Sequence, residues 1–118
     1  MKKIYTLLAL TISFSMNAQM SDYSSGTAAT GTNAVAMGKS TTASGSYSTA
    51  MGRSTEASGN YSVAMGYSTT ASGSPSTAMG WNTTASGTYA VAMGRETTAS
   101  ATYSTAMGND TTASDYAS

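Results

Sequence analysis

The chain has 118 residues, which is enough for one domain at most, and Ser, Thr, Ala and Gly fill more than half of its positions. Beyond residue 14 the only branched aliphatic residues are Val35, Val63 and Val91, which excludes an ordinary globular core of large side chains. Five basic and five acidic residues balance, and Cys and His are absent. This composition excludes disulfides, thiolate zinc sites and a basic surface for nucleic acid.

Residues 1–18 have the layout of a secretory signal peptide. Lys2 and Lys3 precede an apolar run over residues 4–14, and a short polar stretch follows. We expect cleavage after Ala18. A membrane span needs about 20 residues, and the apolar run is shorter than that. The mature chain is therefore expected to have no transmembrane segment. A buried N-terminal helix is the alternative, but the rest of the chain offers no apolar surface suited to receive it.

The remainder is one short repeat. Ala-Met-Gly recurs every 14 residues, and positions within a unit are called sites one to fourteen, counted from Thr32. Residues 19–31 read as a degenerate first repeat or N-terminal cap, residues 32–115 as six full units, and residues 116–118 as the start of a truncated seventh. The six units, called coils 1 to 6, are residues 32–45, 46–59, 60–73, 74–87, 88–101 and 102–115.

The spacing of the larger residues in a unit predicts strands. The fourth site (Val or Thr) and the sixth (Met) are two apart, which is strand spacing and does not fit the seam of a coiled coil. We expect strands at sites three to six and ten to thirteen, and so an all-β solenoid of 14-residue coils with parallel pairing between coils. Glycines at the seventh and fourteenth sites are expected to supply turns of positive φ: Gly38, Gly45, Gly52, Gly59, Gly66, Gly73, Gly80, Gly87, Gly94 and Gly108.

Alternation also suggests which residues line the interior. Glu56 marks the eleventh site as outward, so the tenth-site Thr and twelfth-site Ala are expected to point inward. In the first strand of each unit, the face with the fourth-site Val or Thr and the sixth-site Met is expected to point inward. The small residues at the third and fifth sites are expected to face another copy. A core this thin favours an obligate homo-oligomer. The expected core residues are Val35, Met37, Met51, Val63, Met65, Met79, Val91, Met93 and Met107.

The repeat resembles a known family. Residues 62–66, Ser-Val-Ala-Met-Gly, followed by Ala-Ser-Gly at 71–73, are similar to the head repeat of YadA-like trimeric autotransporter adhesins. The resemblance covers residues 23–118. It implies a left-handed parallel β-roll and a homotrimer on the surface of a Gram-negative bacterium. It also implies binding to extracellular matrix proteins, host cells or other heads.

The sequence departs from that family's pattern in two ways. Met stands where the family has Ile, and Tyr replaces Asn at most second sites. No neck motif, heptad stalk or barrel strands are found in the sequence. Anchoring is therefore expected through a longer form of the chain or by another secretion route.

Two columns of variable residues follow from the stacking. The eighth site carries cations and aromatic rings on an exposed corner, a plausible contact line for a ligand, with an unconstrained loop as the alternative. The second site carries Tyr in four coils and Pro75 in coil 4, and we expect this column to be a structural ladder. The candidate ligand-binding residues are Lys39, Arg53, Tyr67, Trp81 and Arg95.

These features predict a secreted or cell-surface adhesin head module. Its expected partners are other copies of the chain and an extracellular matrix protein or cell-surface ligand. No constellation of residues supports catalysis, and no cofactor or metal is expected. The alternatives are an ice- or crystal-binding solenoid, a purely structural surface or fibre module, and a disordered secreted peptide. Glu56 argues against ice binding because it interrupts the eleventh-site Thr column, and the strict register argues against disorder.

Overall fold

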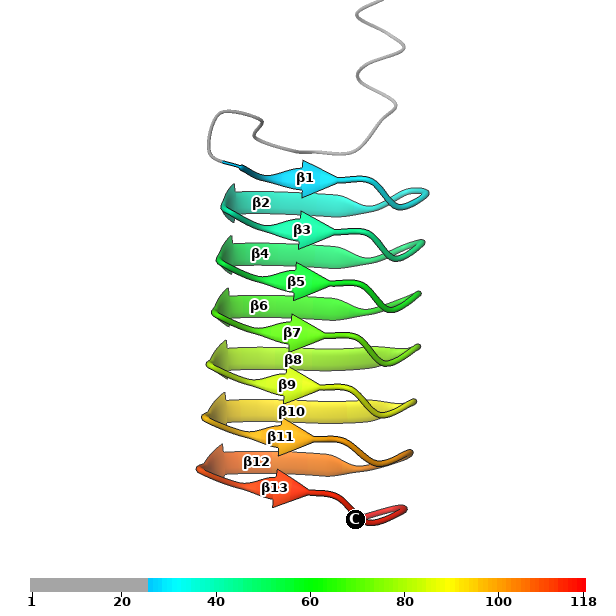
Figure 1. Ribbon diagram of the computed structural model, residues 1–118, viewed down its shortest axis with the longest axis vertical. Coiled ribbons are helices and arrows are strands. Elements are labelled where there is room, and N and C mark those ends of the chain that lie inside the picture. Colours follow the sequence, from blue (N-terminus) through cyan, green and yellow to red (C-terminus); the bar gives the residue numbers. More distant parts are fainter. Residues whose placement is uncertain (1–25) are drawn as a thin grey trace, which may run out of the picture.

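The computed structural model describes residues 26–118, and the expected signal peptide lies outside these described residues. The chain winds into a rod in which two parallel sheets face each other (Figure 1). Sheet B has the longer strands: β2 (Val35–Lys39), β4 (Thr49–Arg53), β6 (Val63–Tyr67), β8 (Ser76–Trp81), β10 (Ala90–Arg95) and β12 (Thr105–Asn109). Sheet A has the shorter ones: β1 (Ala28–Ala29), β3 (Thr42–Ala43), β5 (Glu56–Ala57), β7 (Thr70–Ala71), β9 (Thr84–Ala85), β11 (Thr98–Ala99) and β13 (Thr112–Ala113).

The strands pair in the register that the repeat predicts. Each residue lies beside its equivalent 14 positions along, as Met65 does beside Met79 and Ala71 beside Ala85. All pairs within both sheets are parallel. The expected all-β solenoid with 14-residue coils is therefore confirmed. Among residues 26–118 there is no helix long and apolar enough to cross a membrane.

The two sets of glycines have different roles. The fourteenth-site glycines begin turns as expected, with the Ser48 amide donating to the Gly45 carbonyl oxygen at 3.3 Å, but the positive φ expected of both sets is found at the seventh site and not at the fourteenth. The seventh-site glycines have positive φ, as at Gly66 (φ 121°), but they lie within the sheet B strands rather than after them. Positive φ is not found at Gly45, Gly59, Gly73 or Gly87. A Cβ on Gly59 would stand 2.0 Å from the carbonyl oxygen of Gly73. In coils 1 to 4 the fourteenth-site glycines lie so close to the next coil that a side chain would collide with its backbone, whereas coil 5 carries Ala101 at this site.

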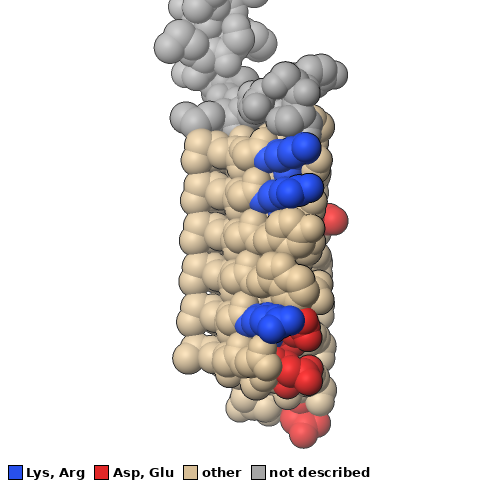
Figure 2. Space-filling model, turned by 90° about the vertical axis from the view of Figure 1, so that its left-hand side faces the viewer, with Lys and Arg blue, Asp and Glu red and all other residues tan. Residues whose placement is uncertain are grey.

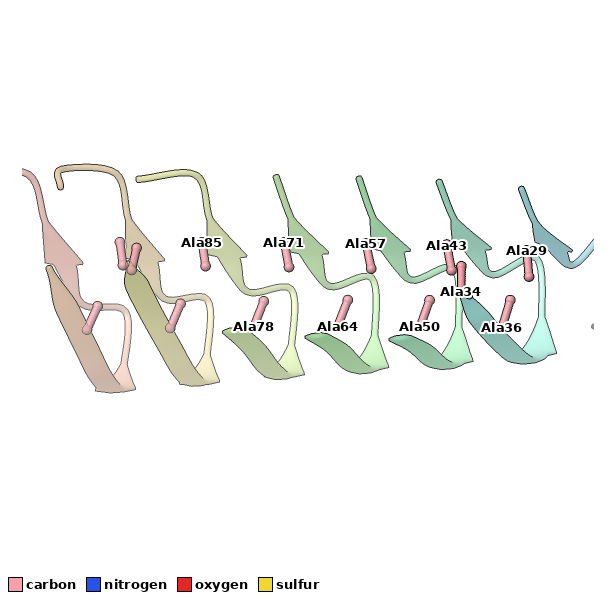
Figure 3. Packing of buried hydrophobic residues seen from close by; sticks show 14 of the residues in the cluster. Ala29, Ala34, Ala36, Ala43, Ala50, Ala57, Ala64, Ala71, Ala78 and Ala85 are labelled. Atoms are coloured by element: carbon pink, nitrogen blue, oxygen red, sulfur yellow. The ribbon is translucent and has the colours of Figure 1, made fainter. Parts of the chain in front are cut away.

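The interior of the rod contains small side chains, and the expected Met and Val core was wrong. Ala64, Ala71 and Ala78 are fully buried, and Figure 3 shows alanines of the two sheets pointing toward each other. Third-site Ser or Ala and tenth-site Thr are buried with them. The residues expected inside lie half-buried or exposed on the outer face of sheet B instead: Val35, Met37, Met51, Val63, Met65, Met79, Val91, Met93 and Met107.

The physical reason is the narrow gap between the sheets. Period-two alternation shows which residues share a face but not which face is inside. With the sheets this close, the only side chains in the gap are those of Ala, Ser and Thr. The inward orientation expected for the tenth and twelfth sites is confirmed. The small third and fifth sites, expected to face another copy, are inside.

The buried hydroxyl groups make this interior weakly stabilising. Most of the interior Thr and Ser hydroxyls have no hydrogen-bond partner among the described residues, Thr69 Oγ1 and Ser62 Oγ included. Thr27 is different, because its Oγ1 donates to the Gly38 carbonyl oxygen at 2.6 Å. An unpaired buried hydroxyl costs about 1–3 kcal/mol. The ladder of backbone hydrogen bonds between coils must therefore supply most of what holds a single rod together.

Candidate functional site

One edge of the rod carries a continuous column of cations and aromatic rings. Each member is the last residue of a sheet B strand, and adjacent members are strand partners. Strand pairing puts them about 4.8 Å apart. We call this the edge column, and it contains all the candidate ligand-binding residues: Lys39, Arg53, Tyr67, Trp81 and Arg95. The register brings them together, while ligand binding by them stays a prediction.

Positive φ at the ninth site turns the chain away from the edge column and into sheet A. Ser68 has φ 52° and Glu96 has φ 53°. From coil 2 on, the amide of the ninth-site residue also donates to the carbonyl oxygen of the edge-column residue in the preceding coil. The Ser68 amide, for example, donates to the Arg53 carbonyl oxygen at 3.0 Å. These hydrogen bonds stack the turns of neighbouring coils on one another. The edge-column side chains, which come just before the turns, are therefore held at the spacing of the coils.

The middle of the edge column is a stack of four side chains. The rings of Tyr67 and Trp81 are 8° from parallel, with centroids 6.3 Å apart. The Arg53 guanidinium lies over Tyr67 at 5.6 Å from the ring centroid, and that of Arg95 lies over Trp81 at 5.0 Å. Tyr67 and Trp81 remain 40% and 42% exposed. Each cation–ring contact contributes about 0.5–1 kcal/mol at such exposure, so the side chains are partly ordered before any ligand arrives.

Charge is divided along the same edge. Figure 2 looks onto it and shows two of the basic groups near one end of the rod, with a third lying among the acidic groups that gather toward the other end. Lys39 and Arg53 lie in coils 1 and 2, and Glu96 and Asp110 follow the column in coils 5 and 6. Arg95 pairs with Glu96 at 3.3 Å, but both side chains are well exposed, so this ion pair adds little stability. Among residues 26–118, Lys39 and Arg53 in coils 1 and 2 are the cations without an ion-pair partner, and Arg53 lies over the Tyr67 ring.

The opposite edge carries the predicted tyrosine ladder. Tyr47 and Tyr61 stack with ring centroids 5.1 Å apart, and Tyr89 and Tyr103 stack at 5.0 Å, each pair nearly parallel. Tyr116, at the first site of the next unit, meets Tyr103 edge-on at 5.6 Å. All five rings are exposed, and Tyr47, Tyr61, Tyr89 and Tyr103 have positive φ.

Pro75 interrupts the tyrosine ladder in coil 4. An open cavity of about 220 Å³ lies beside Pro75, between coils 4 and 5. Its lining residues are Pro75, Ser76, Thr77, Tyr89, Ala90 and Val91. The sequence shows the break in the tyrosine column but not the cavity, because the cavity depends on how the Tyr89 ring lies beside the smaller Pro75.

The Val and Met residues that were expected in the core form the outer face of sheet B. Val63, Met65 and their equivalents make an apolar stripe along the rod, and Met37 and Met107 are 37% and 58% exposed. The pattern of small residues at the third, fifth, tenth and twelfth sites of every coil could have indicated this arrangement. A stripe of this kind is typical of a surface that packs against another protein.

These features define a class of protein: a rod-shaped parallel β-solenoid that repeats one surface pattern along its length. Among residues 26–118 no three His, Cys, Asp or Glu residues gather to hold a metal ion. A family model described as the YadA head domain repeat, which spans two copies of the repeat, matches residues 29–55, 57–83, 71–97, 85–111 and 99–118. The chain therefore belongs to the YadA head domain repeat family, a family of structural adhesin modules. A comparison with curated proteins gave no match.

Proposed function

We propose that the protein is an adhesin head module, secreted to or held at the surface of a Gram-negative bacterium. It attaches the cell to extracellular matrix proteins, host cells or other bacteria. The observation that carries this proposal is the edge column, in which ordered cationic and aromatic side chains recur about every 4.8 Å along a rigid rod of the YadA head family. Arg, Tyr and Trp are the residues that contribute most at protein interfaces.

Assembly into a homotrimer belongs to the same proposal. The apolar stripe on the outer face of sheet B is unpartnered in a single chain, and burying a Met or Val side chain contributes about 1.5–3 kcal/mol. Packing these stripes against each other in the trimer supplies the large-residue core that the interior of one rod lacks. Three copies also present three edge columns, and weak sites joined in this way gain strength by avidity.

Solid-phase binding to collagen, fibronectin and laminin tests attachment. The variant Arg53→Ala/Arg95→Ala removes both guanidinium groups from the stack, and we expect it to bind at least one of these proteins about tenfold more weakly than the parent. The matched control is Thr70→Ala/Thr84→Ala on the outer face of sheet A, which should bind as the parent does. Equal binding by both variants would contradict the assignment of the edge column as the contact surface.

The ice-binding alternative is disfavoured by the outer face of sheet A. The eleventh-site threonines form a column there, but Glu56 stands between Thr42 and Thr70 with an exposed side chain. A carboxylate interrupts the regular hydroxyl lattice that ice binding needs. Thermal hysteresis of a solution of the protein, if measured, would favour ice binding instead.

A further inference from the structure

Coil 4 contains the chain's single Pro and its single Trp. Pro75 precedes strand β8 and Trp81 ends it, so the two residues lie at the same height on opposite edges of the rod. At the second site, where coil 4 has Pro75, four other coils carry a Tyr ring. One edge of coil 4 therefore lacks a ring, and the other edge carries the largest side chain in the protein.

The open cavity beside Pro75 has a lining that suits an aromatic ring. Tyr103 stacks on one side of Tyr89, and the cavity lies on the side of Tyr89 that faces coil 4. Thr77 and Val91 complete the wall, and both belong to the outer face of sheet B. The cavity is therefore continuous with the apolar stripe that we propose packs against other copies. Its volume of about 220 Å³ is enough for an indole ring.

Trp81 cannot fill the cavity of its own chain. Strand β8 has six residues and separates the two edges by roughly 20 Å. Within its own chain Trp81 stacks between Tyr67 and Arg95, and its outer edge stays exposed. A second copy standing beside the first can bring its own Trp81 to the cavity.

We propose that in the assembled protein Trp81 of each copy inserts into the Pro75 cavity of the next copy, which stands parallel to it at the same height. This inference rests on the side-by-side assembly in the proposed function. The contact joins two different edges, so it is heterologous, and repeating it closes a ring rather than forming a two-fold dimer. The insertion sets the relative height of the copies, because a shift by one coil would place Trp81 against Tyr61 or Tyr89.

The contact between copies takes only Trp81 from the edge column. Ligand contact by the edge column then rests on its cations, Lys39, Arg53 and Arg95, which the binding test in the proposed function addresses.

Fluorescence of the single tryptophan tests this proposal directly. In the assembled full chain we expect Trp81 emission to be blue-shifted, and protected from acrylamide, relative to protein diluted until it dissociates. Sedimentation of the same samples gives the mass. The substitution Trp81→Ala should weaken association about tenfold, whereas the control Tyr67→Ala, in a coil whose opposite edge carries Tyr61 instead of a cavity, should weaken it less.

A cavity-filling pair of variants separates this contact from a general loss of stability. Pro75→Tyr restores the tyrosine that other coils carry, with a backbone conformation that Tyr47 and Tyr61 already adopt, so the rod should still fold. We expect it to displace Trp81, with red-shifted emission and weaker association. The double variant Pro75→Tyr/Trp81→Ala should associate more strongly than Pro75→Tyr alone, because it no longer carries the Trp81 ring that clashes with the filled cavity of the next copy.

The outcomes distinguish this inference from the proposed function. An assembled protein whose Trp81 is as accessible as in the dissociated chain would overturn the insertion and leave the adhesin head proposal in place. The same holds if Pro75→Tyr assembles and fluoresces as the parent does. A protein that stays monomeric at every concentration would overturn both the insertion and the proposed assembly.

Discussion

Replacing Gly73 by Ala is expected to weaken the stack of coils near its centre. A Cβ at this position would lie 1.9 Å from the carbonyl oxygen of Gly87 and 2.6 Å from its carbonyl carbon. Both contacts are with backbone, so no side chain can move to relieve them. The Gly73 amide also donates to the Ala85 carbonyl oxygen at 3.2 Å, which holds the two coils together at that point. Coil 5 carries Ala101 at the equivalent site and still pairs with coil 6, so the neighbouring backbone can shift to admit a Cβ. We expect a loss of about 1–3 kcal/mol in the free energy of unfolding.

Thermal unfolding followed by circular dichroism measures this effect. The control is Ser72→Ala, one residue earlier, where the side chain is exposed and its removal should change the melting temperature little. A Gly73→Ala protein that melts with the parent would show that the coils are not in this close contact.

Placing carboxylates on the apolar stripe is expected to abolish assembly. Met65 and Met79 are strand partners on the outer face of sheet B, and Met65→Asp/Met79→Asp would put two adjacent charges on the face that we propose packs against other copies. A buried, unpaired carboxylate is strongly unfavourable, and two of them side by side repel each other. The interior of the coil is untouched, so the variant should lose its partners before it loses its strands.

Light scattering against protein concentration measures the assembly state of this variant. Thr70→Asp/Thr84→Asp is the matched control: it places the same two charges in the same coils on the outer face of sheet A, where Glu56 is already tolerated. We expect a monomer for the methionine variant and the parental mass for the control. If both variants keep the parental mass, the stripe is not the packing surface.

The repeat alone predicts most of the fold. The 14-residue period and the two-residue spacing of Val63 and Met65 predict strands, parallel pairing and an in-register column at every site. The inside and outside of sheet B could not be predicted in the same way, because alternation looks the same from either face. The space between the sheets decides it, because the side chains buried there are those of Ala, Ser and Thr.

The candidate site was predictable as a column but not as a set of contacts. Register alone places Arg53 beside Tyr67 and Trp81 beside Arg95. Whether the guanidinium groups lie over the rings depends on side-chain torsions that spacing does not determine. The cavity at Pro75 similarly required the positions of neighbouring coils, although the break in the tyrosine column was visible in the sequence.

A disulfide placed between neighbouring coils tests the stacking register most directly. The parent has no Cys, and Thr70 and Thr84 are strand partners on the outer face of sheet A. Their Cα atoms are expected about 4.8 Å apart, within disulfide range. Under mild oxidation, Thr70→Cys/Thr84→Cys should form an intramolecular bond, whereas Thr70→Cys/Ala85→Cys should not, because Ala85 points into the rod. Equal bond formation in both variants, or none in the first, would contradict the 14-residue coil.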